Sequence, residues 1–111
     1  RLILADALGY ASKQNLDCLI DLATLTGAVS VALGNSITGV MTPYPDLLRR
    51  IKKASELAGE KIWELPLEKE YKSHFKSQVA DVKNIGPSGQ AGTIIGGLFL
   101  KEFVKEGLPW A

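Results

Sequence analysis

The first quarter of the chain carries two hydrophobic patterns, one after the other. Residues 1–14 place apolar or small side chains at positions 2, 3, 4, 5, 7, 8, 10 and 11 and contain no proline, which predicts a helix buried on most sides. Residues 16–23, LDCLIDLA, form an almost continuous apolar run of strand length. Because a helix followed directly by a buried strand is typical of α/β packing, we predict an α/β fold with a mixed, largely parallel sheet flanked by helices.

The middle of the chain alternates short apolar runs with one longer amphipathic segment. Residues 28–34, AVSVALG, fit either a helix or a strand; we favour a helix of about two turns, followed by a short strand over residues 37–41. Residues 45–60 begin with proline and aspartate and reach a glycine at position 59, the start and stop signals of a helix. The face that this helix is expected to bury is made of Leu47, Ile51, Ala54 and Ala58.

The last part of the chain predicts a short extended piece and two further helices. Residues 61–67, KIWELPL, are extended and are broken by a proline. Tyr71 and Phe75 lie four positions apart, which favours a short amphipathic helix over residues 68–77. Residues 86–104 begin as a glycine-rich loop, where glycine allows a tight turn and close packing. The helix expected after this loop carries Ile94, Ile95, Leu98, Phe99 and Phe103 at helical spacing.

Composition and charge exclude several classes of partner. Thirteen Lys and Arg against twelve Asp and Glu give a net charge of +1 over 111 residues, which would attract neither nucleic acid nor an anionic membrane. Residues 22–45 carry no charge, but their four threonines, two serines and two prolines argue against a membrane span. The single cysteine, Cys18, lies in the apolar run and is expected to be buried. A lone buried thiol favours a reducing compartment, and we expect a cytoplasmic location.

Common catalytic motifs are excluded by their spacing. A phosphate-binding loop needs a lysine after its last glycine, whereas Gly92 is followed directly by Thr93. The one histidine, His74, has no second histidine or neighbouring cysteine to complete a metal site. Asp81 and Asn84 have the chemistry of turn or capping residues. None of these residues therefore predicts a catalytic site.

The most informative stretch is DLATLTGA at residues 21–28, which places Thr24 and Thr26 where a core would contain apolar side chains. In open α/β sheets, ligands bind beyond the carboxyl ends of the strands, and a threonine and glycine stretch can present backbone groups there without obstruction. Alternatively, the two threonines cap the helix that follows. From the spacing alone, both interpretations stay open.

A series of motifs resembles the di-metal leucyl aminopeptidase family. They are Arg-Leu at the start, DLATLTGA, ALG, GV, the W-x-L-P of residues 63–66, the A-D-x-x-N-I-G of residues 80–86, and AG followed by an apolar helix ending in FLKEFV. No single motif is decisive, but their order and spacing match from one end of the chain to the other. The resemblance implies the fold of the family's catalytic domain. It also implies a hydrolase that releases N-terminal amino acids, with a leucine-like preference, from peptides.

The resemblance also implies which part of that domain is present. The family signature Asn-Thr-Asp-Ala-Glu-Gly-Arg-Leu is matched only by its last two residues, Arg1 and Leu2. After the position of Ala111, the family continues into a His-Leu-Asp-Ile-Ala-Gly strand of the substrate pocket. We therefore expect residues 1–111 to be a partial C-terminal catalytic domain, cut just after the metal-ligand signature and before the last substrate-pocket strand.

The cofactors implied are two divalent metal ions, which are manganese, zinc or magnesium in this family. They bind the amino terminus and the scissile carbonyl of the substrate and activate the attacking water. Their ligands are the aspartate and glutamate of the signature together with a lysine and two aspartates further upstream. None of these is matched in residues 1–111. We therefore expect no metal ligand in this chain and no activity from the chain alone.

Five residues match family positions that have a role. Arg1 matches the signature arginine, which holds a bicarbonate ion that manages protons at the attacking water, and is the catalytic candidate. Thr24 and Leu25 are expected to contact substrate or bicarbonate through their backbones. Gly27 is expected to line the pocket for the first side chain of the substrate, and Thr26 completes the substrate-binding set.

An alternative from a different class is a non-catalytic interaction unit, because the resemblance implies a hexamer as the usual oligomer. An interrupted sheet leaves strand groups unpaired, and such edges favour association. The expected partners are therefore peptide substrates and further copies of the same protein, without nucleic acid or membrane.

Overall fold

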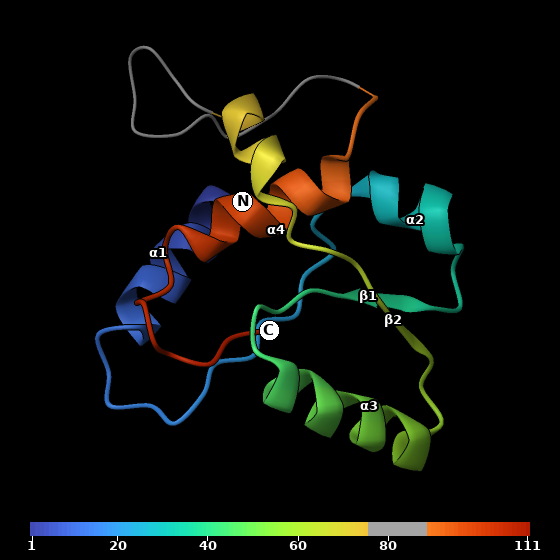
Figure 1. The fold of residues 1–111 in the computed structure, drawn as a ribbon, viewed down its shortest axis with the longest axis horizontal. Coiled ribbons are helices and arrows are strands. Elements are labelled where there is room, and N and C mark those ends of the chain that lie inside the picture. Colours follow the sequence, from blue (N-terminus) through green and yellow to red (C-terminus); the bar gives the residue numbers. More distant parts are fainter. Residues whose placement is uncertain (76–88) are drawn as a thin grey trace.

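The computed structural model describes residues 1–75 and 89–111, and Figure 1 shows how they are arranged. Its elements, in chain order, are α1 (Leu2–Ala11), α2 (Gly27–Leu33), β1 (Thr38–Val40), α3 (Pro45–Ala58), β2 (Ile62–Glu64), the 3₁₀ helix η1 (Lys69–Phe75) and α4 (Gly92–Lys101). The motif of residues 80–86, with Asp81 and Asn84, lies outside the described residues.

Strands β1 and β2 form a parallel pair, and α3 lies between them in the sequence. Thr38 pairs with Ile62, and Val40 pairs with Glu64. Parallel neighbours need a crossover connection, which α3 supplies; in Figure 1 this helix runs below the pair. The predicted α/β class, with a parallel sheet flanked by helices, is confirmed. The helix favoured for residues 28–34 and the short strands on either side of α3 are confirmed as well.

A second parallel contact joins two distant segments of the chain. Leu19 forms an isolated bridge with Trp110. The N–H of Leu19 donates to the carbonyl of Pro109 at 2.8 Å, and the N–H of Ala111 donates to the carbonyl of Leu19 at 3.1 Å. The predicted strand over residues 16–23 is therefore reduced to a single bridge in the described residues.

The expectation that this apolar run is buried is also wrong. Ile20 is 52% exposed and Leu22 is 87% exposed, and the thiol of Cys18 is exposed as well. Ile20 and Leu22 lie two positions apart and therefore point to the same face of an extended chain. A run of this kind is buried only where packed elements cover both faces, and within residues 1–75 and 89–111 this face is not covered.

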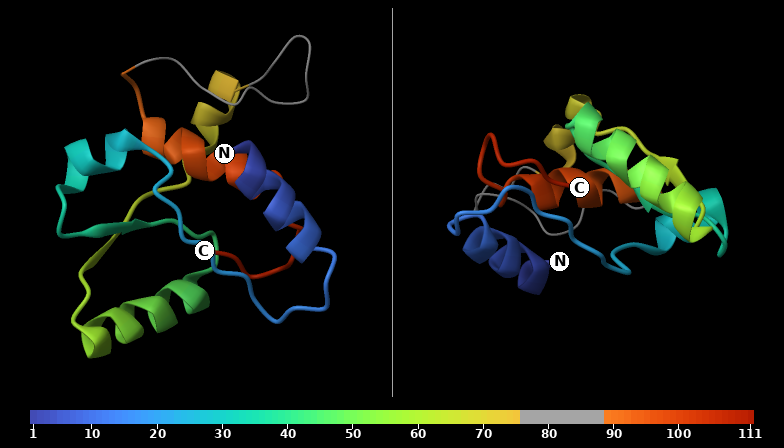
Figure 2. Two further views of the ribbon diagram at one scale, coloured as in Figure 1. Left: turned by 180° about the vertical axis from the view of Figure 1, so that it is seen from behind. Right: turned by 90° about the horizontal axis from the view of Figure 1, so that it is seen from below.

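The core is built around α4. Ile95, Leu98, Phe99 and Leu100 are each at most 2% exposed. Figure 2 shows α4 in the middle of the molecule, with α1 on one side and α3 on the other. The helix predicted from the apolar spacing of residues 86–104 is thus confirmed as the most deeply buried element of the described chain.

Helix α1 contacts this core through one narrow stripe. Ala5 and Leu8 are each 2% exposed and pack with Phe99. Ile3 and Tyr10 are 87% and 71% exposed. The helix itself is confirmed, but the prediction that it is buried on most sides is wrong, because it packs against the core only through the side that carries Leu4, Ala5 and Leu8 in the described structure.

Helix α3 begins and ends as its sequence predicts. Pro45 occupies the first turn, and Gly59 ends the helix in the left-handed conformation with φ of 73°, which glycine adopts without a steric penalty. The predicted buried face is partly wrong. Leu47 is buried as predicted, and its neighbour Leu48 is buried too. Ala54 and Ala58, which were expected to be buried, are exposed. The fully buried residues of α3 thus lie in its first turn, whereas Ile51 further along is half-buried.

Glycines let other elements approach α4 closely, as the sequence predicts. A Cβ placed at Gly97 would lie 2.7 Å from Sδ of Met41, closer than van der Waals contact allows. Gly89, in the loop before the helix, has φ of 81°. The segment before this loop is a 3₁₀ helix, a tighter form than the amphipathic helix predicted there, and its Tyr71 packs against Ile95 and Leu98.

Candidate functional site

Three of the five candidate residues surround one position on α4. A Cβ placed at Gly96 would lie 3.1 Å from Cδ2 of Leu25, 3.2 Å from Cγ2 of Thr26 and 3.6 Å from Nη2 of Arg1. Gly96 has no side chain, and for that reason the three groups can meet over the helix backbone. Residues from the start of the chain and from the DLATLTGA stretch therefore converge on one place, which we call the Gly96 cluster: Arg1, Leu25, Thr26 and Gly96.

The side chain of Thr26 does not cap the helix that it precedes. Thr26 stands at the N-cap position of α2 with extended backbone angles, φ −141° and ψ 139°, but its side chain makes no capping hydrogen bond. Its hydroxyl instead shares a hydrogen bond with the hydroxyl of Thr93 at 3.1 Å, and the two residues are 67 positions apart. The capping interpretation is thus wrong for Thr26, whose side chain joins the start of α2 to the first turn of α4.

Thr93 is a site residue that sequence analysis missed. The sequence signal was present, because Thr93 follows the glycine-rich loop directly, but it was weighed only as part of a phosphate-binding motif. Beside it, a Cβ at Gly92 would lie 3.2 Å from Cβ of Ala28. The first turns of α2 and α4 are therefore in direct contact.

Replacement of Thr93 by valine is expected to lower the free energy of unfolding by about 1 kcal/mol, because valine keeps the shape but leaves the Thr26 hydroxyl without this partner. The double variant T26V/T93V should cost less than the sum of the single variants. Urea unfolding of the four proteins measures this coupling. T38V removes an exposed hydroxyl of β1 and is the matched control; its free energy of unfolding should stay within about 0.5 kcal/mol of the parent. If the cost of the double variant equals the sum of the costs of T26V and T93V, the contact is contradicted.

Thr24 and Gly27 lie at the surface beside the Gly96 cluster. Thr24 is exposed, so a ligand can reach this residue from the solvent side. A Cβ at Gly27 would meet no atom within 4 Å, and the space next to it is therefore open. Leu25, between Thr24 and Thr26, turns its side chain toward the core formed by Phe99 and its neighbours, which leaves its backbone for contact with a ligand.

Arg1 is half-buried beside this surface. Burial lowers the pKa of its guanidinium, but an arginine remains protonated at neutral pH because its ordinary pKa is so high. The guanidinium of Arg1 therefore places a permanent positive charge beside Gly96, where Leu25 and Thr26 also approach α4. This combination suits an anion or a carbonyl oxygen.

Asp21, the first residue of the DLATLTGA stretch, is tied to the other end of the chain. The indole N–H of Trp110 donates to Oδ2 of Asp21 at 2.6 Å, and the backbone N–H of Asp21 donates to the carbonyl of Ala111 at 3.0 Å. Burial raises the pKa of the Asp21 carboxyl above its ordinary value of 3.8, and the bond from Trp110 lowers it by a smaller amount.

The raised pKa of Asp21 predicts a pH dependence of stability. The folded state binds the proton more tightly than the unfolded state, so this contribution is fully present below the unfolded pKa and is lost as pH rises through the folded pKa. D21N removes the titration. The free energy of unfolding of the parent should therefore fall relative to that of D21N as pH rises from about 4 through the raised pKa of Asp21. Urea unfolding of both proteins across this range measures the difference, and a change of opposite sign would contradict the prediction.

The described residues do not supply a metal-binding group. Among residues 1–75 and 89–111, no three histidine, cysteine, aspartate or glutamate side chains are grouped so that they could hold a metal ion. The residues of the Gly96 cluster carry hydroxyl, guanidinium and backbone groups, which do not fit the oxygen-rich anionic set that hard divalent cations need.

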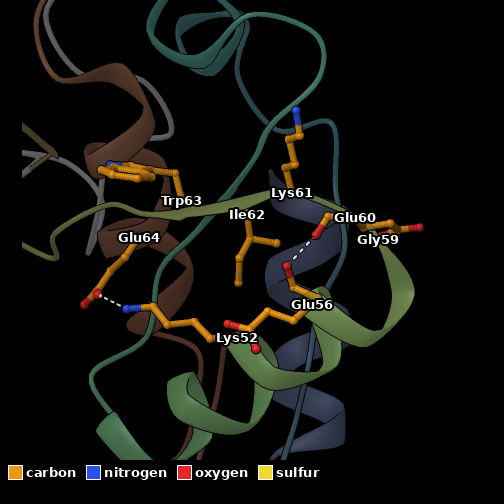
Figure 3. Close-up of a pocket in the computed structure, with 9 residues that line it drawn as sticks. Lys52, Glu56, Gly59, Glu60, Lys61, Ile62, Trp63 and Glu64 are labelled. Atoms are coloured by element: carbon orange, nitrogen blue, oxygen red, sulfur yellow. Dashed lines mark hydrogen bonds and ion pairs between the residues drawn. The ribbon is translucent and has the colours of Figure 1, made fainter.

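A separate hollow of about 550 Å³ lies between the C-terminal half of α3 and β2. An ion pair of 3.0 Å between Lys52 and Glu64 crosses one side of it. In Figure 3, Ile62 points from β2 toward α3, whereas Lys61 and Trp63 point away from the helix. This hollow shares no residue with the Gly96 cluster, and it is open and lined mainly by charged side chains.

The arrangement defines an α/β protein in which helices α2 and α4 and the N-terminus gather hydroxyl, cationic and glycine residues at one surface. The chain belongs to the cytosol aminopeptidase family: the model of the family's catalytic domain matches residues 1–111. The family resemblance identified from the sequence motifs is thus confirmed.

Curated relatives and a solved structure agree with this membership. The chain is 54% identical over 111 residues to a probable cytosol aminopeptidase of Nostoc punctiforme, covering 100% of this chain and 22% of the relative. It is 54% identical over 110 residues to leucine aminopeptidase A1, chloroplastic, of Solanum lycopersicum, covering 99% of this chain and 19% of the relative. A mutant of tomato leucine aminopeptidase superposes on 98% of this chain and 21% of its own with a TM-score of 0.95 and 53% identity.

The relatives are much longer than this chain. It spans about a fifth of the length of the proteins that it matches. The names of the relatives place some in the cytosol and others in the chloroplast. In the part of the chain that the structure describes, no helix has both the length and the apolar character that a membrane crossing needs.

Proposed function

We propose that residues 1–111 form a partial C-terminal catalytic domain of a metal-dependent aminopeptidase that releases N-terminal amino acids, with a leucine-like preference, from peptides. The observation that carries the proposal is the convergence of Arg1, Leu25 and Thr26 on Gly96 in a chain that belongs to the cytosol aminopeptidase family. The family membership supports the reaction class, and the cluster supports the position of the substrate.

Each candidate residue has a role in this proposal. The exposed backbone of Thr24 and the backbone of Leu25 contact the peptide substrate or an anion beside it. The open space at Gly27 receives the first side chain of the peptide, and Thr26 fixes the loop to α4 through Thr93. Arg1 holds an anion, bicarbonate in this proposal, close to the reacting carbonyl, where its fixed positive charge favours negative charge.

Two divalent cations, manganese, zinc or magnesium, belong to the proposal as cofactors of the longer enzyme. The described residues do not form a ligand set for them, so we derive no step through the metals from this chain. In this proposal the chain alone is inactive and supplies the floor of the substrate pocket. The proposed location is cytoplasmic, which the name of the Nostoc punctiforme relative supports.

Hydrolysis of leucine p-nitroanilide in the presence of manganese tests this proposal. A protein extended upstream to include the family's metal-ligand signature should cleave the anilide, and the 111-residue chain should not. In the extended protein, R1M should lower kcat by about 10²-fold, as loss of a proton-handling group does. R49M removes an exposed arginine that pairs with Asp46 and should change nothing. Lack of hydrolysis by a folded, metal-loaded extended protein would overturn the proposal.

A second candidate is a non-catalytic assembly unit of a hexamer. It is favoured by the large apolar side chains that are exposed on the described chain, among them Ile3, Leu22 and Val31 at 87%, 87% and 90%. Exposed apolar surface of this kind is typical of contacts with other protein surfaces. Sedimentation of the 111-residue chain separates the two cases, because a monomer at all concentrations would contradict the assembly role.

A further inference from the structure

The buried Trp110, near the end of the chain, binds the first residue of the DLATLTGA stretch. Trp110 is 3% exposed, and its indole N–H finds its acceptor in Oδ2 of Asp21 at 2.6 Å. A buried indole N–H needs such a partner, and a charged acceptor makes the bond stronger than a neutral one. The sequence does not relate the two residues, since they are 89 positions apart.

The backbone strengthens this tie. Asp21 donates its N–H to the carbonyl of Ala111 at 3.0 Å, one residue after the tryptophan that binds its side chain. On the other side, the carbonyl of Trp110 accepts a hydrogen bond from the hydroxyl of Thr42, which itself accepts from the N–H of Tyr44 at 3.1 Å. Asp21 is thereby connected to the turn between β1 and α3.

The indole ring anchors this connection in the core. Trp110 belongs to the same buried cluster as Ala5, Leu8 and Phe99. Asp21 is therefore held by hydrogen bonds to a residue that is itself fixed by packing against α1 and α4. A carboxylate at the surface without such a partner would leave the backbone near it free to move.

The loop that follows has a second fixed point at its far end. Leu25 packs against the core cluster, and Thr26 is bonded to Thr93 of α4. Between the two fixed points, Leu22 is 87% exposed and Thr24 is exposed too. The position of the Thr24 backbone is thus set by its two ends and not by packing of its own side chain.

We propose that Asp21 and Trp110 are positioning residues that hold the backbone of residues 24–27 in the geometry that binds substrate. The inference rests on the proposed function for its meaning in catalysis, but the placement of the loop stands on the contacts alone. In a merely structural role, the same hydrogen bond would add stability and leave the loop unaffected.

Order parameters from ¹⁵N relaxation of the 111-residue chain measure the placement directly. We expect values near 0.85 for the amides of residues 24–26 in the parent and values near or below 0.6 in D21L, with the amides of α4 unchanged. D21N should keep the parent values, because the asparagine carbonyl still accepts the indole N–H. D17N, on an exposed carboxylate of the same segment, is the matched control.

W110F tests the same hydrogen bond from its other side, and it can be used if D21L unfolds the chain. It keeps an aromatic ring in the core but removes the donor, and it should lower the same order parameters. Loop order parameters that stay at the parent values in the folded variants would overturn the proposal. A fall that extends equally over α4 would also overturn it, because that result reports general loss of structure.

Kinetics in the extended, metal-loaded protein add a second measurement, the KM, which a merely structural role of Asp21 would not change. Destabilisation alone reduces the amount of active enzyme and so lowers the apparent kcat at unchanged KM. Loss of loop placement weakens substrate binding, and D21L should raise KM about tenfold while D21N stays near the parent. An unchanged KM in D21L would count against the inference. If the parent itself cleaves no anilide, the proposed function fails, and the order parameters still decide the placement.

Discussion

Replacement of Phe99 by alanine is expected to lower the free energy of unfolding by about 3–5 kcal/mol, the usual cost of deleting a buried aromatic side chain. Phe99 is 0% exposed and lies between the buried stripe of α1 and the ring of Phe103, whose centroid is 5.1 Å away. Alanine would leave a cavity among groups that are held by two helices. Because small domains have a stability of only about 5–15 kcal/mol, this variant should lose much of its structure at 37 °C.

Urea unfolding followed by circular dichroism measures the effect. L57A is the matched control, since Leu57 is 82% exposed on α3 and its truncation should cost less than about 0.5 kcal/mol. Equal costs for the two variants would mean that α4 is not the centre of the core.

Replacement of Gly96 by leucine is expected to lower kcat/KM by about 10²-fold in the extended, metal-loaded enzyme. A side chain at this position starts 3.1 Å from Leu25 and 3.2 Å from Thr26, so both residues must move away from α4. Displacement of a substrate-positioning group by about 1 Å can cost this much. The leucine p-nitroanilide assay measures the loss.

The control for this variant is G9L in α1. A Cβ at Gly9 would meet no atom within 4 Å, so the same substitution there should leave kcat/KM at the parent value. Thermal unfolding of both variants separates a local displacement from global unfolding. Full activity of G96L would show that the Gly96 cluster is not the substrate site.

Local patterns predicted the helices and short strands because their causes are local. The proline and aspartate at the start of α3 and the glycine at its end act within one turn. The apolar composition of α4 is that of a helix covered on all sides, and its residues 95–100 are all buried. The burial of individual residues was predicted less well. Whether Leu48 or Ala54 is buried depends on what packs against α3, and the spacing within the helix carries no information about that.

The sequence likewise predicts one part of the candidate site and not the other. The stretch at residues 21–28 attracted attention because its hydroxyl and glycine residues follow an apolar run, and its assignment to a family came from the order of motifs. The partners of this stretch could not be inferred from spacing. Thr93 and Trp110 meet Thr26 and Asp21 only after the chain has folded, and no local rule relates positions so far apart. The roles of Arg1 and residues 24–27 stay predictions until substrate is bound.

The bridge between residue 19 and residue 110 has a consequence for synthesis of the protein. In the described part of the chain, the backbone hydrogen bonds of residues 19–21 join them to residues 109–111, so the ribosome releases this segment long before these partners exist. Contacts of such long sequence separation form late and slowly. During that interval the backbone groups of Leu19 and Asp21 lack these partners, and unpaired strand groups of this kind can pair with other nascent chains.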